Sequence, residues 1–256
     1  MRSSKAISAG ASDLLSKVPA VTVAFWVIKI CATTVGETGG DAVSMTLKVG
    51  YLVSTFIFLG IFGIALAAQV LSKRYHPFFY WFVVVATTTV GTTMSDYLDR
   101  TAGLGYIKSS IILFGGVLLA LYLWHRFTGA IEFENITTRK NEVFYWVTIL
   151  VSNTLGTALG DFMATTTGLG FQRGAMVFAF LIAVVAAAHL FTNTPENVLF
   201  WSAYVLTRPL GDTLTKPVPE GGFGLSRITS SLVIAAVMAV GIILMSRKKK
   251  LAPESG

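Results

Sequence analysis

One segment, FWVIKICATTVGETGGD at residues 25–41, recurs three more times along the chain. The copies are YWFVVVATTTVGTTMSD at 80–96, YWVTILVSNTLGTALGD at 145–161 and FWSAYVLTRPLGDTLTK at 200–216. Each copy opens with an aromatic residue followed by tryptophan, and each has a glycine ten residues beyond that tryptophan. Aromatics make up 12% of the chain, so four copies with one spacing indicate an internal repeat.

The spacing of the copies divides the chain into two halves. Successive tryptophans of the repeat lie 55, 65 and 55 residues apart, and the ten extra residues fall in the polar stretch 132–141. We therefore expect a first transmembrane half at 17–128, a second at 141–246 and a basic tail at 247–256. Small residues spaced four apart let helix backbones approach closely. The residues expected to mediate this packing are Trp26, Gly36, Trp81, Gly91, Trp146, Gly156, Trp201 and Gly211.

Composition indicates a membrane protein. Of the 256 residues, 54% are hydrophobic and only 13% are charged, whereas a soluble domain carries about 25% charged residues. A helix that spans a bilayer needs about 20 apolar residues, and continuous apolar runs favour helices over a β-barrel. The sequence predicts an all-α, polytopic bundle of four parallel two-helix repeats, with spans near 18–38, 49–71, 77–95, 107–125, 142–163, 172–192, 195–214 and 227–246.

The basic residues predict the orientation. Twelve lysines and arginines lie in the tails and the loops on one side of the membrane, and seven lie on the other side. The positive-inside rule then places both termini in the cytoplasm. The net charge of +7 is explained by topology and not by nucleic-acid binding. The lipid bilayer is the partner that composition requires, and self-association is left open.

The repeated tryptophans and glycines carry a resemblance to a known family. Over residues 17–246 the chain resembles a family of bacterial multi-pass membrane proteins with four tandem two-span repeats, each with a characteristic tryptophan. The resemblance implies this architecture and a bacterial inner membrane, but no reaction. The fourth copy departs from the pattern, because its acid, Asp212, follows Gly211 directly and Lys216 stands where the other copies have aspartate.

Polar residues gather on the odd-numbered spans, and they form the candidate site. Charges inside a membrane are costly and usually mark a pathway or a site. Carboxylates beside hydroxyls suit a hard cation such as Mg²⁺ or Mn²⁺, or a proton relay. The predicted pathway residues are Glu37, Thr38, Asp41, Thr92, Asp96, Thr157, Asp161 and Asp212, with Lys29, Arg208 and Lys216 as counter-ions. The predicted metal ligands are Glu37, Asp41, Asp96 and Asp161.

Two functions remain open at this stage. The first is a transporter or exporter of a small cation, with its pathway between the odd-numbered spans. The second is a non-transport protein, such as an assembly partner or a sensor of envelope stress, in which the acids cap helices at the outer boundary. An enzyme is not expected, because the chain has no HExxH, GxSxG, phosphate-binding glycine loop or cysteine cluster. No cofactor is expected beyond a divalent cation.

Overall fold

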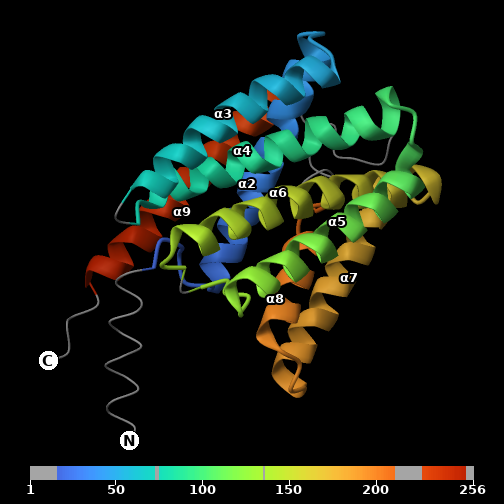
Figure 1. Cartoon of the computed structure of the whole chain (residues 1–256). Helices are drawn as coiled ribbons and strands as arrows, with labels where there is room; N and C mark the ends of the chain where they lie inside the picture. The colour runs from blue at the N-terminus through green and yellow to red at the C-terminus, as the bar shows by residue number, and fades with distance from the viewer. Residues whose placement is uncertain (1–15, 73–74, 135, 211–226, 252–256) are drawn as a thin grey trace, which may run out of the picture.

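The chain folds into long helices joined by short turns (Figure 1). The structure is a computed structural model that describes residues 16–72, 75–134, 136–210 and 227–251. No strand occurs among them. The helices are α2 (Val23–Asp41), α3 (Tyr51–Leu71), α4 (Pro77–Asp96), α5 (Gly105–Thr128), α6 (Arg139–Asp161), α7 (Gly170–Phe191), α8 (Glu196–Leu206) and α9 (Arg227–Leu251). Three of them continue into π-helical turns, η1 (Ala42–Thr46), η2 (Tyr97–Thr101) and η3 (Phe162–Thr166).

The repeats interlock, because the second helix of each one packs on the first helix of the next. Helix α3 lies along α4, α5 along α6 and α7 along α8. The last helix, α9, returns to the first repeat and packs along α2. Contacts between α4 and α6 and between α2 and α9 therefore join the two halves of the chain.

An aromatic chain closes the first helices of the four repeats into a ring. The ring centroid of Phe25 lies 5.4 Å from that of Trp81, Tyr80 lies 5.3 Å from Trp146, and Tyr145 lies 6.1 Å from Trp201. Phe200 then lies 5.7 Å from Trp26, which brings the fourth repeat back to the first. Helices α2, α4, α6 and α8 thus form an inner ring with pseudo-four-fold symmetry, which confirms the four parallel repeats predicted from the sequence.

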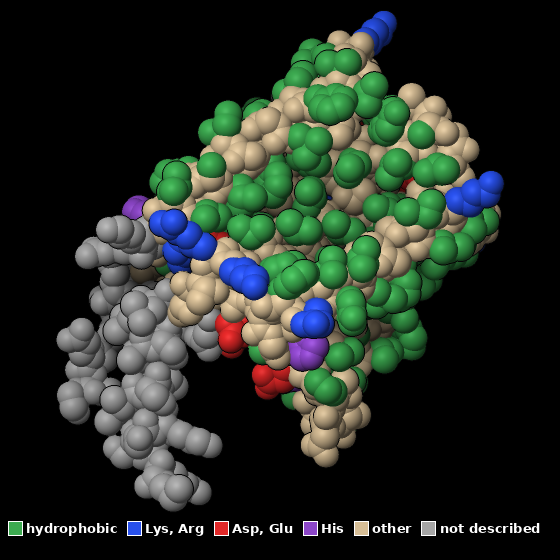
Figure 2. Space-filling model, viewed as in Figure 1, with side chains coloured by type: hydrophobic (Ala, Val, Ile, Leu, Met, Phe, Trp, Pro, Cys, Tyr) green, Lys and Arg blue, Asp and Glu red, His purple; other side chains and the backbone are tan. Residues whose placement is uncertain are grey.

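The remaining helices form an outer layer with an apolar surface (Figure 2). In the most apolar part of α4 and α6, 72% and 67% of residues are buried, against 22%, 33% and 11% in α3, α5 and α7. These five helices, with the π turns of α4 and α6, are long and apolar enough to cross a membrane. The all-α polytopic architecture is therefore confirmed. Helix α2 is interrupted by charges, and α8 has only 11 residues.

The same turn joins the two helices of the first three repeats. Glycines begin the outer helices of these repeats or cap them, and Gly50, Gly105 and Gly170 all have positive φ. Two residues earlier, Gly103 and Gly168 have φ of 72°, and Lys48 occupies the equivalent place with φ of 57°. Positive φ is uncommon for a residue with a side chain, so the turn geometry of the repeat is kept even where glycine is replaced.

Helix α8 ends earlier than the predicted span 195–214. The helix stops at Leu206, and turns follow at residues 207–210, which are the last described residues before 227. Proline at 209 has no N–H to donate, its ring clashes with the carbonyl four residues earlier, and it disfavours helical backbone at Arg208. The Arg208 amide instead donates to the carbonyl of Val205 at 3.2 Å.

The connection between the halves covers the aromatic end of the inner ring. Phe133 stacks on Phe200 with centroids 4.5 Å apart, and Ile136 is fully buried. The Lys17 amide donates to the Ile136 carbonyl at 3.2 Å, and the Lys17 ammonium pairs with Glu142 at 2.8 Å. The described residues of the central connection are thus part of the folded body.

Candidate functional site

Close helix contacts position the site. An added Cβ at Gly36 would overlap the Thr88 hydroxyl, and one at Gly91 would lie 3.0 Å from the Asn153 backbone. A Cβ at Gly156 would lie 2.5 Å from the Arg208 Cβ. These glycines hold the same place in their repeats, and so do Thr88, Asn153 and Arg208. Each glycine therefore receives the same position of the next inner helix, and the fourth repeat supplies an arginine there.

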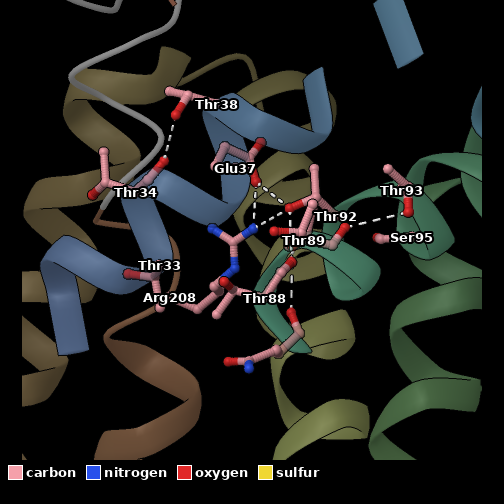
Figure 3. A network of polar contacts seen from close by, with 12 residues as sticks. Thr33, Thr34, Glu37, Thr38, Thr88, Thr89, Thr92, Thr93, Ser95 and Arg208 are labelled. Carbon is pink, nitrogen blue, oxygen red and sulfur yellow. Dashed lines mark hydrogen bonds and ion pairs between the residues drawn. The ribbon is translucent and has the colours of Figure 1, made fainter. Parts of the chain in front are cut away.

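Glu37 and Arg208 form an ion pair in the middle of the inner ring (Figure 3). Their side chains are 1% and 0% exposed. The guanidinium also contacts the Thr92 hydroxyl, which lies 2.8 Å from the Glu37 carboxylate. Helices α2 and α4 and the turn after α8 thus each contribute one member of the cluster. Desolvating two charges costs several kcal/mol per ion, and the mutual attraction offsets this only with good geometry and further hydrogen bonds.

Lys29, on α2, lies beside the C-terminal end of α8 and is not part of that ion pair. Its side chain is fully buried, and its ammonium donates to the Tyr204 carbonyl at 3.0 Å and to the Thr207 hydroxyl at 2.8 Å. The ammonium also lies 4.0 Å from the centroid of the Tyr204 ring. The sequence predicted a counter-ion for an acid, whereas the structure places Lys29 on neutral oxygens and an aromatic face.

At the positions of Lys29, Glu37 and Arg208, charged residues of the described chain occur in the first and fourth repeats and not in the other two. At the Lys29 position the second and third repeats have Val84 and Ile149, and at the Glu37 position they have Thr92 and Thr157. Arg208 corresponds to Thr33, Thr88 and Asn153 in the other repeats. The charges therefore gather where α2 meets α8, and the seam between the first and fourth repeats is the candidate site.

Three predicted acids lie at the far ends of the inner helices. Asp41, Asp96 and Asp161 each form the last α-helical residue before a π turn and are at most 3% exposed. Arg100 bridges two of them, with its guanidinium 3.0 Å from Asp96 and 3.4 Å from Asp161. These acids are buried, unlike the solvent-exposed caps of the non-transport interpretation.

The predicted metal site is not assembled in the described part of the chain. No group of three or more His, Cys, Asp or Glu residues there lies close enough to hold a metal ion. Glu37 is paired with Arg208, whereas Asp96 and Asp161 share Arg100. Three of the four predicted ligands are therefore divided between two clusters that already contain arginine.

The remaining predicted residues have varied surroundings. The Thr38 hydroxyl donates to the Thr34 carbonyl at 3.0 Å, and the Thr157 hydroxyl donates to the Asn153 carbonyl at 3.3 Å, so both are bonded within their own helices. Of the packing residues, Trp81, Trp146 and Trp201 are buried and Trp26 is half-buried. Gly211, Asp212 and Lys216 lie outside the described residues.

Sequence reasoning missed two contributions to the polar clusters. Arg100 was counted only among the seven basic residues of the less basic side, although it stands four residues after Asp96 and this spacing places both on one helix face. The Asn153 amide donates to the Thr87 hydroxyl at 3.1 Å and links α6 to α4. Alignment of the repeats would have found Asn153, because it holds the position of Arg208.

The ring of four inner helices, the interlocked outer helices and the apolar surface define a four-repeat helical membrane protein. A family model described as a Repeat of Unknown Function (DUF347) matches residues 24–75, 79–130, 144–194 and 199–250. The chain belongs to this family, and each match covers one two-helix unit of the fold. No curated protein and no solved structure matches the chain.

Proposed function

We propose that this protein is a proton-coupled transporter of a small cation whose pathway runs along the seam between α2 and α8. The observation that supports the proposal is the buried Glu37–Arg208 pair, joined by Thr92 in the interior of a membrane protein. Ionisable groups in such a position are costly and are usually found in substrate, ion or proton pathways. The protein is then no enzyme, and it lies in a bacterial inner membrane with both termini in the cytoplasm.

A purely structural role explains the pair less well. Replacing a buried ion pair by apolar residues of similar volume is often neutral or stabilising. The second and third repeats form the corresponding contacts with uncharged threonine and asparagine. Because the fold needs no charge at these positions, a function is the simpler reason for Glu37 and Arg208.

The alternative is a non-transport protein that senses or assembles in the membrane. It is favoured by the close contacts between the inner helices and by the pairing of Arg100 with Asp96 and Asp161. In the transport proposal the same features describe a closed conformation, in which Arg100 neutralises Asp96 and Asp161 until the pathway opens.

Purified protein in liposomes separates the two functions. Liposomes with an acidic interior and a pH-sensitive dye would receive Na⁺, K⁺, Mg²⁺ or Mn²⁺ salts in turn. Transport predicts that at least one cation releases protons faster than in empty liposomes, and that Glu37→Gln lowers this rate at least about tenfold, as expected for a lost proton-transfer group. Glu196→Gln, an exposed acid at the start of α8, serves as the control and should retain the rate. If no cation moves protons in the wild type, the non-transport function stands.

A further inference from the structure

The C-terminal end of α8 has the properties of a cation site. The last four carbonyls of any helix lack partners within the helix, and they carry the negative end of its dipole. In α8 this end is buried, since Tyr204 and Thr207 are 1% and 3% exposed. Interrupted helices that present such ends inside a membrane form cation sites in several transporter folds. Here the Lys29 ammonium fills that place.

The surroundings of Lys29 fit a monovalent cation better than a hard divalent one. The two oxygen contacts measure 2.8 and 3.0 Å, whereas Mg²⁺ and Ca²⁺ bind oxygens at about 2.0–2.6 Å and favour carboxylates. No carboxylate of the described residues pairs with Lys29. A neutral carbonyl, a hydroxyl and an aromatic face are instead the ligands that K⁺ and ammonium ions accept.

The site belongs to the seam and not to the repeat as a whole. Tyr204 holds the place in the fourth repeat that Lys29 holds in the first, and the other two repeats have Val84 and Ile149 there. Arg208 follows Thr207 directly, and its charge is compensated by Glu37. A second cation beside Arg208 is therefore tolerated because that guanidinium is already paired.

We propose that the Tyr204 carbonyl, the Tyr204 ring and the Thr207 hydroxyl form a binding site for a monovalent cation of ammonium or potassium size, with the Lys29 ammonium as its resident occupant. The site binds an external cation when the lysine leaves it. The binding site itself does not depend on the proposed transport function. Its physiological meaning rests on that function, because the site would then name the class of cation that is exchanged.

The test removes the resident ammonium and supplies a soluble one. Lys29→Ala leaves the oxygens and the ring in place and opens the space of the lysine side chain. Thermal unfolding in detergent would be compared in ammonium, methylammonium, potassium and choline chloride at equal ionic strength. We expect a midpoint on the order of 3 °C higher in at least one of the small cations than in choline, as saturation of a weak site gives. The wild type, with the site filled, should show no such difference.

Lys140→Ala is the matched control. Lys140 also donates to a backbone carbonyl, that of Phe127 at 2.9 Å, and it lies 5.5 Å from the Phe127 ring centroid, but it is exposed. It should give equal midpoints in all salts. Combining Lys29→Ala with Thr207→Val should abolish the difference between small cations and choline. Equal midpoints of Lys29→Ala in every salt would overturn the proposal.

Three further outcomes are decisive. If Lys29→Ala is too unstable to purify in choline, recovery of monodisperse protein after solubilisation in each salt replaces the midpoint, and equal recovery overturns the site. Cation binding by Lys29→Ala without any transport by the wild type would keep the site and refute the transport function. Transport by the wild type without cation binding by Lys29→Ala would keep the transport function and refute the site.

Discussion

Gly156 is one of the residues whose size the fold limits most tightly. A Cβ there would lie 2.5 Å from the Arg208 Cβ, 2.7 Å from its Cγ and 3.1 Å from the Val205 carbonyl oxygen. We therefore expect Gly156→Ala to lower the free energy of unfolding by about 1–3 kcal/mol, the usual cost of overpacking. Unfolding in detergent by a titrated denaturant measures this change.

Gly115→Ala is the control for that measurement. Gly115 lies in the outer helix α5, and an added Cβ would meet nothing within 4 Å. Since alanine favours helix over glycine by about 1 kcal/mol, this substitution should leave stability unchanged or raise it. Equal effects of the two substitutions would mean that the inner helices are not in close contact at Gly156.

Glu37 and Arg208 should show strong coupling in a double-mutant cycle. Replacing Glu37 alone by methionine leaves a buried guanidinium without this carboxylate and should cost about 3–5 kcal/mol. Replacing both residues by methionine removes both desolvation costs and should restore stability to within about 1 kcal/mol of the wild type. The double variant should nevertheless lose transport. A double variant that remains as unstable as Glu37→Met would show that the pair is needed for folding.

At the level of helices, the sequence predicted most of the structure through local patterns. The glycine and threonine positions in 25–41 and its copies predicted which helices lie inside, because small and hydroxyl residues favour close helix contacts. The second spans of the repeats are uniformly apolar, and the low burial of α3, α5 and α7 agrees with an outer position. Both features can be found in single segments, without knowledge of which segments meet.

The sequence prediction missed that α8 ends before the predicted span does. The apolar run 195–214 suggested a continuous span, although Pro209 stands inside it. A proline in a transmembrane helix is often tolerated, because neighbouring groups satisfy the carbonyls that it frees. Here Lys29 and the Thr207 hydroxyl bond the Tyr204 carbonyl, at 3.0 and 3.1 Å. The helix end before Pro209 thus depends on Lys29, which lies 175 positions before Tyr204 in the sequence. No local pattern indicates this contact.

For the whole molecule, closure of the ring was the feature hardest to predict. The repeats indicated a common axis, but not that each outer helix would pack on the following repeat. Because α9 packs on α2, the first and last repeats meet, and the charges of Lys29, Glu37 and Arg208 come together there. Glu37, Asp41, Asp96 and Asp161 were predicted as one set of metal ligands, whereas the structure pairs Glu37 with Arg208 and pairs Asp96 and Asp161 with Arg100.

The orientation of the whole bundle provides the final prediction. The aromatic end carries the central connection between the halves, and the acid-bearing end carries the turns after η2 and η3. Twelve of the basic residues belong to the side of the tails and of that connection, so we expect this side to face the cytoplasm. Green fluorescent protein fused after Lys140 or after Lys250 should fluoresce, while alkaline phosphatase fused after Gly103 or Gly168 should be active. Phosphatase activity after Lys140 would reverse the orientation, and opposite results at Lys140 and Lys250 would require an odd number of spans in the second half.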